Sequence, residues 1–184
     1  MRKCVLFYLG SVQIALQLAT HKARKTSMGI RKAYDDMADR YQYFGDSYQV
    51  HNDKNGFGQI WLSAAFVDLK QGGDTFWIIA KRKANDWHWI SNNDFILLVD
   101  AERFNGGGHV VNSEVTQEAG FFETKVICNE EIHCGTDVAI MNLIANGQSV
   151  KFRLGNADFV MPAGLIADVK AIAEDVASTG GYGQ

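Results

Sequence analysis

The chain has 184 residues, a hydrophobic content of 47%, a single proline and a formal net charge of −3 at pH 7. This length suits one domain with a sizeable core, and no apolar stretch approaches the roughly 20 residues that a membrane-spanning helix requires. The first 34 residues hold seven Lys and Arg and no acid, which leaves about −10 on the remainder. An acidic body argues against general nucleic-acid binding, because phosphate affinity is mostly electrostatic.

Residues 1–26 combine basic residues with an apolar run, as secretory leaders and organelle transit segments do. Gln13 and Gln17 interrupt the apolar part. A cleavage site prefers a small residue two positions before an alanine, but these two glutamines occupy that position. Three interpretations stay open for this segment. It is a cleaved leader of a secreted or periplasmic protein, a transit segment, or the first ordered element of the fold.

Residues 27–43 carry apolar and aromatic side chains at spacings of three and four, which predicts an amphipathic helix with Ser27 as its cap. These side chains are Ile30, Tyr34, Met37, Ala38 and Tyr41. Residues 45–58 are polar and bounded by glycines, which predicts a connecting loop.

Residues 59–100 contain three apolar segments separated by turn residues, which predicts a β-meander. The first two segments are expected to form a hairpin, and the strand that follows places Trp87 and Trp89 on one face. Residues 95–99 are continuously apolar, so we expect them to form a central strand that is covered on both faces.

The glycine run at residues 105–108 predicts a flexible point, residues 109–118 an edge strand and residues 121–128 a firmer strand. Beyond them the pattern predicts a helix at 136–146, a hairpin and a last helix at 164–177 that turns Asp168 outward. The predicted fold is therefore α+β. We expect a largely antiparallel β-meander sheet, with the helices near 27–43, 136–146 and 164–177 covering one face. The single domain spans residues 27–177, and residues 178–184 form a flexible tail.

Cys128 and Cys134 flank a predicted turn, with His133 beside the second. They are interpreted either as a disulfide, which suits an exported protein once a leader with Cys4 is removed, or as two reduced structural thiols. The spacing matches no common zinc pattern, and His133 is only a sequence neighbour of a nucleophile. No metal and no cofactor is expected.

Aromatic and basic residues alternate across the tryptophan hairpin in a way that is typical of a ligand platform, although tryptophans on strands belong more often to a core. The residues are Trp77, Lys81, Arg82, Lys83, Trp87 and Trp89. The acids Asp94, Asp100 and Glu102 resemble paired catalytic carboxylates, but acids at strand ends more often form turns.

No motif carries a catalytic signature, so an enzyme is not the leading interpretation. The sequence favours a non-enzymatic α+β domain that acts through protein–protein contacts, either exported or part of a larger assembly. The alternatives are a small-ligand or glycan binding module built on the tryptophan hairpin, and a small acidic inhibitor or immunity-type protein that masks a basic partner.

Overall fold

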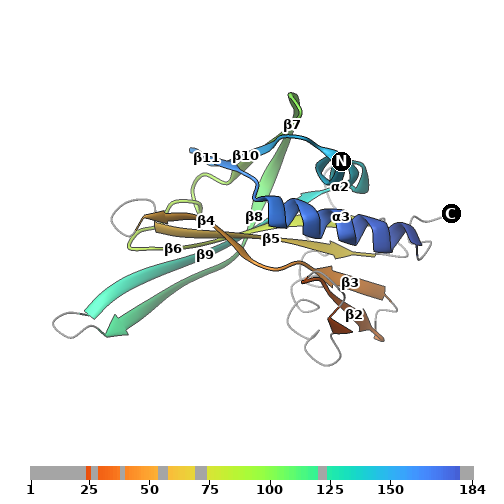
Figure 1. Cartoon of the computed structure of the whole chain (residues 1–184). Helices are drawn as coiled ribbons and strands as arrows, with labels where there is room; N and C mark the ends of the chain where they lie inside the picture. Colours follow the sequence, from red (N-terminus) through yellow and green to blue (C-terminus); the bar gives the residue numbers. More distant parts are fainter. Residues whose placement is uncertain are drawn as a thin grey trace, which may run out of the picture.

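The structure is a computed structural model that describes residues 24–25, 29–37, 40–53, 58–68, 74–119 and 124–178. Within these ranges the chain folds as a mostly antiparallel, open sheet with two helices (Figure 1). The predicted leader, apart from residues 24–25, and residues 179–184 of the predicted tail lie outside the described residues. Neither helix of the described residues is long and apolar enough to cross a membrane.

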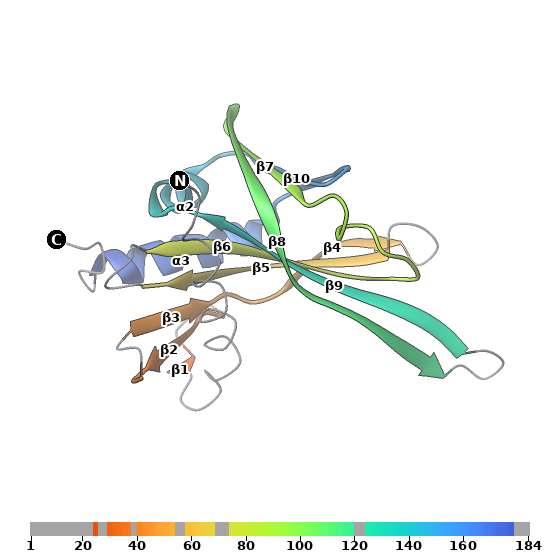
Figure 2. The same ribbon diagram turned by 180° about the vertical axis from the view of Figure 1, so that it is seen from behind.

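The strands follow one another along a single sheet, in the order β1-β2-β3-β5-β6-β9-β8-β7-β10-β11, and β4 pairs with β5 beside this path. Figure 2 shows β2 and β3 at one end and the β8–β9 hairpin extending from the other. The elements are β1 (Arg24–Lys25), β2 (Arg31–Asp35), β3 (Arg40–Phe44), β4 (Tyr48–Asp53), β5 (Gly58–Val67), β6 (Thr75–Ala84), β7 (Asp94–Val99), β8 (Glu102–Ala119), β9 (Thr124–Thr136), α2 (Val138–Asn146), β10 (Val150–Leu154), β11 (Ala157–Val160) and α3 (Ala163–Ser178).

The hydrophobic core joins α3 to the sheet. Leu165, Val169 and Ile172 recur at spacings of four and three on α3, and all three are fully buried in one cluster with Leu62 of β5 and Leu97 of β7. The helices predicted at 136–146 and 164–177 are confirmed as α2 and α3. The side chain of Asp137 caps α2 by accepting a hydrogen bond from the amide of Ile140. The β5–β6 and β10–β11 hairpins are confirmed as well.

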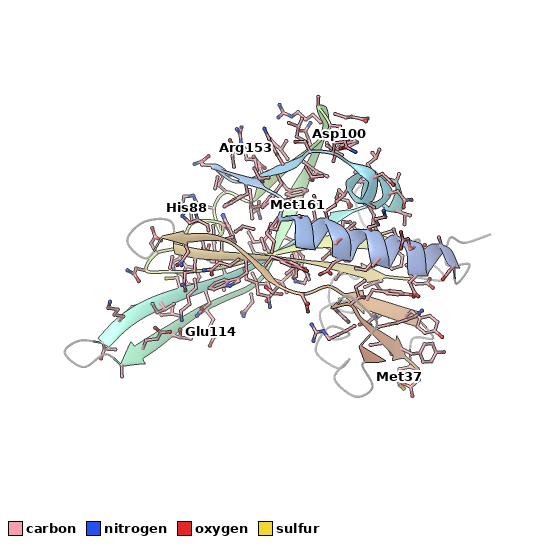
Figure 3. All side chains as sticks on the ribbon, in the orientation of Figure 1. Met37, His88, Asp100, Glu114, Arg153 and Met161 are labelled. Atoms are coloured by element: carbon pink, nitrogen blue, oxygen red, sulfur yellow. The ribbon has the colours of Figure 1, made fainter. Side chains whose placement is uncertain are left out.

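The helix predicted for residues 27–43 is wrong. The described residues there form β2 and β3, an antiparallel pair in which Tyr34 lies opposite Tyr41 with ring centroids 5.0 Å apart. Tyr34 is 49% exposed and Met37, labelled in Figure 3, is 95% exposed, so the predicted apolar stripe is not buried as a unit, although Ile30 belongs to the core. Aromatic residues favour strands, and cross-strand ring pairs stabilise them; the helical spacing was coincidental.

The loop predicted for residues 45–58 is only partly correct, since Tyr48–Asp53 forms β4. The meander is also incomplete, because β7 does not pair with β6. Strands β9 and β8 lie between them. β7 is consequently not the central strand, and its burial alternates: Phe95, Leu97 and Val99 are buried, whereas Ile96 and Leu98 are partly exposed. One face of the continuous apolar run is therefore open.

The glycine run is part of β8, and not a flexible connection. Gly107 has open space where a side chain would lie, but a Cβ on Gly108 would come within 2.5 Å of Ile132 and 2.9 Å of the carbonyl oxygen of Asn93. The amide of Gly108 donates to that same oxygen at 2.8 Å. Gly108 therefore permits the close approach at which β8 leaves β7 and continues along β9 alone.

The helical pattern predicted that Asp168 points outward, but this residue is buried. Its Oδ2 accepts hydrogen bonds from the amide of Asp46 at 2.8 Å and from the hydroxyl of Tyr48 at 3.0 Å, so it ties α3 to the connection between β3 and β4. Burial raises the pKa of the Asp168 carboxyl. Burial, together with the hydrogen bond to Asp168, raises the pKa of the Tyr48 hydroxyl to about 12.

The buried carboxyl of Asp168 predicts a pH dependence of stability. Its raised pKa means that the folded protein binds the proton more tightly than the unfolded chain, so this group reduces the free energy of unfolding as pH rises above about 4. Asp168→Asn does not titrate and keeps an oxygen that can accept both hydrogen bonds. In urea unfolding between about pH 4 and pH 7, the wild type should lose stability relative to this variant; a constant difference, or the opposite trend, would contradict the assignment.

Candidate basic groove

Strands β8, β7, β10 and β11 carry two cross-strand rows of side chains on the face that points away from the core. In the first row, Arg103 lies beside Leu98, Leu98 beside Lys151, and Lys151 beside Val160. The second row holds Asn105, Ile96, Arg153 and Asp158. The rows arise because residues on alternate positions of each strand share a face.

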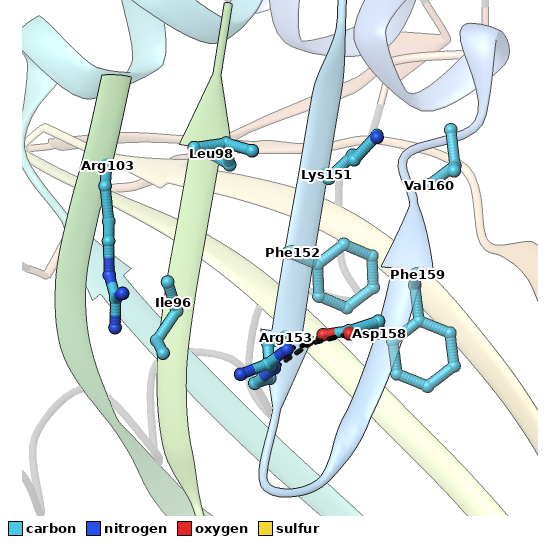
Figure 4. A pocket seen from close by; sticks show the side chains of 9 residues that line it. All are labelled: Ile96, Leu98, Arg103, Lys151, Phe152, Arg153, Asp158, Phe159 and Val160. Carbon is cyan, nitrogen blue, oxygen red and sulfur yellow. Dashed lines mark hydrogen bonds and ion pairs between the residues drawn. The ribbon is translucent and has the colours of Figure 1, made fainter. Parts of the chain in front are cut away.

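All residues of these rows except Asn105 line a groove of about 450 Å³, which we call the basic groove (Figure 4). Its aliphatic residues are Ile96, Leu98 and Val160, and Val160 is 68% exposed. Phe152 and Phe159 also border it, with ring centroids 4.9 Å apart, but Phe152 is buried and belongs to the core. The groove thus offers apolar surface that the fold leaves in contact with water.

Cationic side chains surround this apolar surface. Arg153 forms a two-pronged ion pair with Asp158, at 2.6 Å from Nε to Oδ1 and 2.8 Å from Nη2 to Oδ2, and this pairing holds the pKa of Asp158 below its usual range. Arg103 donates to Asn105 at 3.0 Å. Neither Arg103 nor Lys151 forms an ion pair with another described residue, so the groove has a surplus of two positive charges in a chain of net charge −3.

The described residues that line the basic groove are cationic and apolar, apart from one carboxylate. That carboxylate, of Asp158, is held by Arg153, and none of these lining residues is a histidine or a cysteine or carries a hydroxyl group. In the described part of the chain, no group of three or more His, Cys, Asp or Glu side chains could hold a metal ion. The groove instead suits a ligand that combines carboxylates with aliphatic groups.

The structure divides the predicted tryptophan platform among three places. Trp77, Lys81 and Lys83 lie on one face of β6, while Arg82 lies on the other face and is buried. Residues 87–90 do not form a strand. The remaining two side chains are Trp87, which is 40% exposed, and Trp89, which is fully buried.

Arg82 belongs to a buried ion pair instead of a surface platform. Its Nη1 lies 2.8 Å from Oε2 of Glu130 on β9, and both side chains are almost fully buried. The Glu130 carboxylate also accepts hydrogen bonds from the amides of His88, Trp89 and Ile90, the shortest being 2.7 Å from Trp89. This carboxylate fixes the loop that precedes β7 and places Trp89 in the core.

Cys128 and Cys134 are free, buried thiols on the same extended strand, β9. Six residues of strand separate their Cα atoms by roughly 20 Å, whereas a disulfide requires less than about 7 Å. The bridge between them therefore does not form in this structure, and the turn predicted between them is wrong. Burial raises the pKa of both thiols, that of Cys134 to about 12, which makes them poor nucleophiles.

The predicted acids at the strand ends do not converge on a site. Asp100 and Ala101 form the two-residue turn between β7 and β8, with φ of 47° and 76°. The Asp100 carboxylate accepts from the amides of Gln148 and Ser149, at 2.9 Å and 2.7 Å, and so fixes the start of β10. Figure 3 shows Asp100 and Arg153 in the same part of the molecule, with Glu114 in another.

The basic groove was not predicted from the sequence, although its signals are visible there. The continuous apolar run of residues 95–99 was interpreted as a strand covered on both faces, while Lys151 and Arg153 lie in the predicted hairpin between the last two helices and were given no role. The pairing of β10 with β7 brings the two patterns together. Comparison of the chain with protein-family models, curated proteins and solved structures found no match.

The two tryptophans of the loop before β7 should respond differently to truncation. Trp89→Ala removes a fully buried ring and should cost about 3–5 kcal/mol of unfolding free energy. Trp87→Ala, the matched control, should cost less than about 1 kcal/mol, because its ring is 40% exposed. Urea denaturation of both variants measures the difference; equal costs would show that the loop is placed wrongly.

Proposed function

We propose that this protein is a non-enzymatic binding protein that acts through protein–protein contacts, and that its basic groove docks an acidic, partly aliphatic segment of the partner. The observation that carries the proposal is the position of Arg103 and Lys151, two cations without an acidic partner among the described residues, on either side of Leu98.

The aliphatic surface of the groove would supply affinity. Val160 and the outward sides of Ile96 and Leu98 remain in water in the isolated chain, and covering them contributes a gross free energy of about 25 cal/mol for each Å² of apolar surface removed from water, which offsets part of the entropy lost on association. Exposed aliphatic side chains that are grouped, as these are, mark interaction surfaces more often than single ones do.

The cations would supply specificity and orientation. Carboxylates of a partner can pair with Arg103 and Lys151 at the rim, which selects acidic segments and speeds their approach. Arg153 is already neutralised by Asp158, so it contributes less. The surplus of positive charge also disfavours a basic partner at this surface, and this supports an acidic segment over the alternative of an inhibitor that masks a basic protein.

We also infer that α2 and α3 both lie on the face opposite the basic groove. The inward residues of β7 and β10, such as Leu97 and Phe152, belong to the same buried cluster as Ile144 of α2 and Ile172 of α3. Their neighbours along each strand, Ile96 and Lys151, point to the other side. This arrangement leaves the groove free to receive a partner.

The glycan or small-ligand alternative has less support from the positions of its residues. A stacking platform needs several exposed rings on one face. Here Trp89 is buried, and Trp87 and Trp77 lie on different segments of the chain.

Selection from a random-peptide library with the intact protein tests the proposal. The enriched peptides should combine Asp or Glu with Leu, Ile or Val, and the double variant Arg103→Glu, Lys151→Glu should bind them at least about tenfold more weakly, because it repels the carboxylates. Lys170→Glu, at an exposed position on α3, is the control, because it changes the charge of one site by as much as each of the groove substitutions does. This control should bind the peptides normally.

Two results would contradict the proposal. One is enrichment of peptides without acidic residues. The other is equal binding by the wild type and by the double variant, when circular dichroism shows that both are folded.

A further inference from the structure

The β8–β9 arm consists of residues 115–119 of β8 and 124–128 of β9, and Figures 1 and 2 show it extending away from the rest of the sheet. β6 pairs with β9 only as far as Cys128, opposite Ala84. Beyond that point the described chain forms a two-stranded ribbon. Such a ribbon is marginally stable in water unless another strand or layer supports it.

One edge of the arm has no neighbour among the described strands. Along residues 112–119, β9 is the only described strand that pairs with β8, because the pairing with β7 ends at Gly107. Alternate residues of an antiparallel strand direct their N–H and C=O groups away from the partner. About half of the backbone polar groups of this segment therefore point to an open edge, which is the usual template for pairing with another chain.

The two faces of the arm differ in charge. One face carries the buried Glu130, and the side chains of the arm on that same face, from Val115 to Ala119 and from Thr124 to Cys128, are uncharged. They include Val115 and Val126, which are 53% and 50% exposed. On the other face, Glu118 forms an ion pair with Lys83 and lies opposite Lys125. Charged side chains are one of the devices that protect edge strands from pairing with another chain. The arm carries none of them on the first face.

We propose that the open edge of β8 pairs with the same edge of a second copy of this chain, in antiparallel fashion about a two-fold axis at Val115. Such an interface uses the same surface on both copies and closes as a dimer. It extends the two sheets into one through seven residues on each chain, Asn112 to Glu118, which span roughly 23 Å.

The side chains favour this register. With the axis at Val115, the two Val115 residues meet, and Glu114 lies opposite Thr116 while Glu118 lies opposite Asn112. An axis one residue later would place Glu114 opposite Glu118 twice, and an axis one residue earlier would place two copies of Glu114 together. Like charges directly opposite each other destabilise a sheet. The self-pairing at Val115 brings none together, so the segment is compatible with a second copy of itself.

The mass in solution tests the proposal directly. Light scattering or sedimentation equilibrium of the full chain at about 100 µM should give twice the mass of one chain, since a micromolar dimer is nearly complete at that concentration. Val115→Lys places two ammonium groups side by side at the axis and should weaken the dimer at least about tenfold. Val126→Lys is the control, because Val126 has the same exposure and face but lies on β9, away from the axis.

A second pair of variants reports on the register. Thr116→Lys creates two ion pairs with the second copy's Glu114 and should tighten the dimer, whereas Thr116→Glu creates two repulsions and should loosen it. A wild type that remains a monomer would overturn the proposal. So would a dimer that Val126→Lys disrupts as strongly as Val115→Lys does, since that result would indicate packing of faces instead of pairing of edges.

Discussion

The buried carboxylate of Glu130 is the constraint on which the rest of the described structure depends. A charge with no exposure costs several kcal/mol unless its partners replace the lost water. Here the replacement consists of the Arg82 guanidinium from β6 and the backbone amides of residues 88–90. Arg82 is satisfied in turn by Glu130 and by the carbonyl oxygen of Asp86, at 2.7 Å. The loop cannot leave its position without exposing an uncompensated charge in the core.

Both proposed interaction surfaces depend on this loop. It delivers the chain to β7, and the carbonyl oxygen of Asn93 at its end accepts from Gly108, where β8 separates from β7. β7 then presents Ile96 and Leu98 to the basic groove, and β8 continues as the arm. A single buried ion pair on β6 and β9 thereby sets the start of β7 and the point at which β8 becomes an edge. The groove and the arm remain separate surfaces, so two different contacts can be made by one chain.

Local patterns predicted what depends on local chemistry. The α3 stripe and the hairpins β5–β6 and β10–β11 follow from spacing and turn residues alone. The helix at 27–43 failed because an aromatic hairpin imitates the helical period when its tyrosines pair across the strands. The groove and the Glu130 contacts were not predictable in this way, because they join residues more than 40 positions apart: Glu130 with Trp89, and Lys151 with Leu98. Arg82 stands between Lys81 and Lys83, and Glu130 stands between Asn129 and Glu131, so both are indistinguishable from surface charges until the register is known.

Amide hydrogen exchange of Glu130→Ala tests this account most directly. Removing the carboxylate deprives Arg82 of its buried partner, leaves it the exposed Asp86 carboxylate at 2.6 Å, and frees the three loop amides, which should destabilise the protein by about 3 kcal/mol. Exchange should accelerate first at residues 88–99, the loop and β7, and the Trp89 fluorescence should become accessible to quenchers while α3 retains its protection. Unchanged protection of β7 and an inaccessible Trp89 in the folded variant would contradict the claim that Glu130 holds this part of the sheet in place.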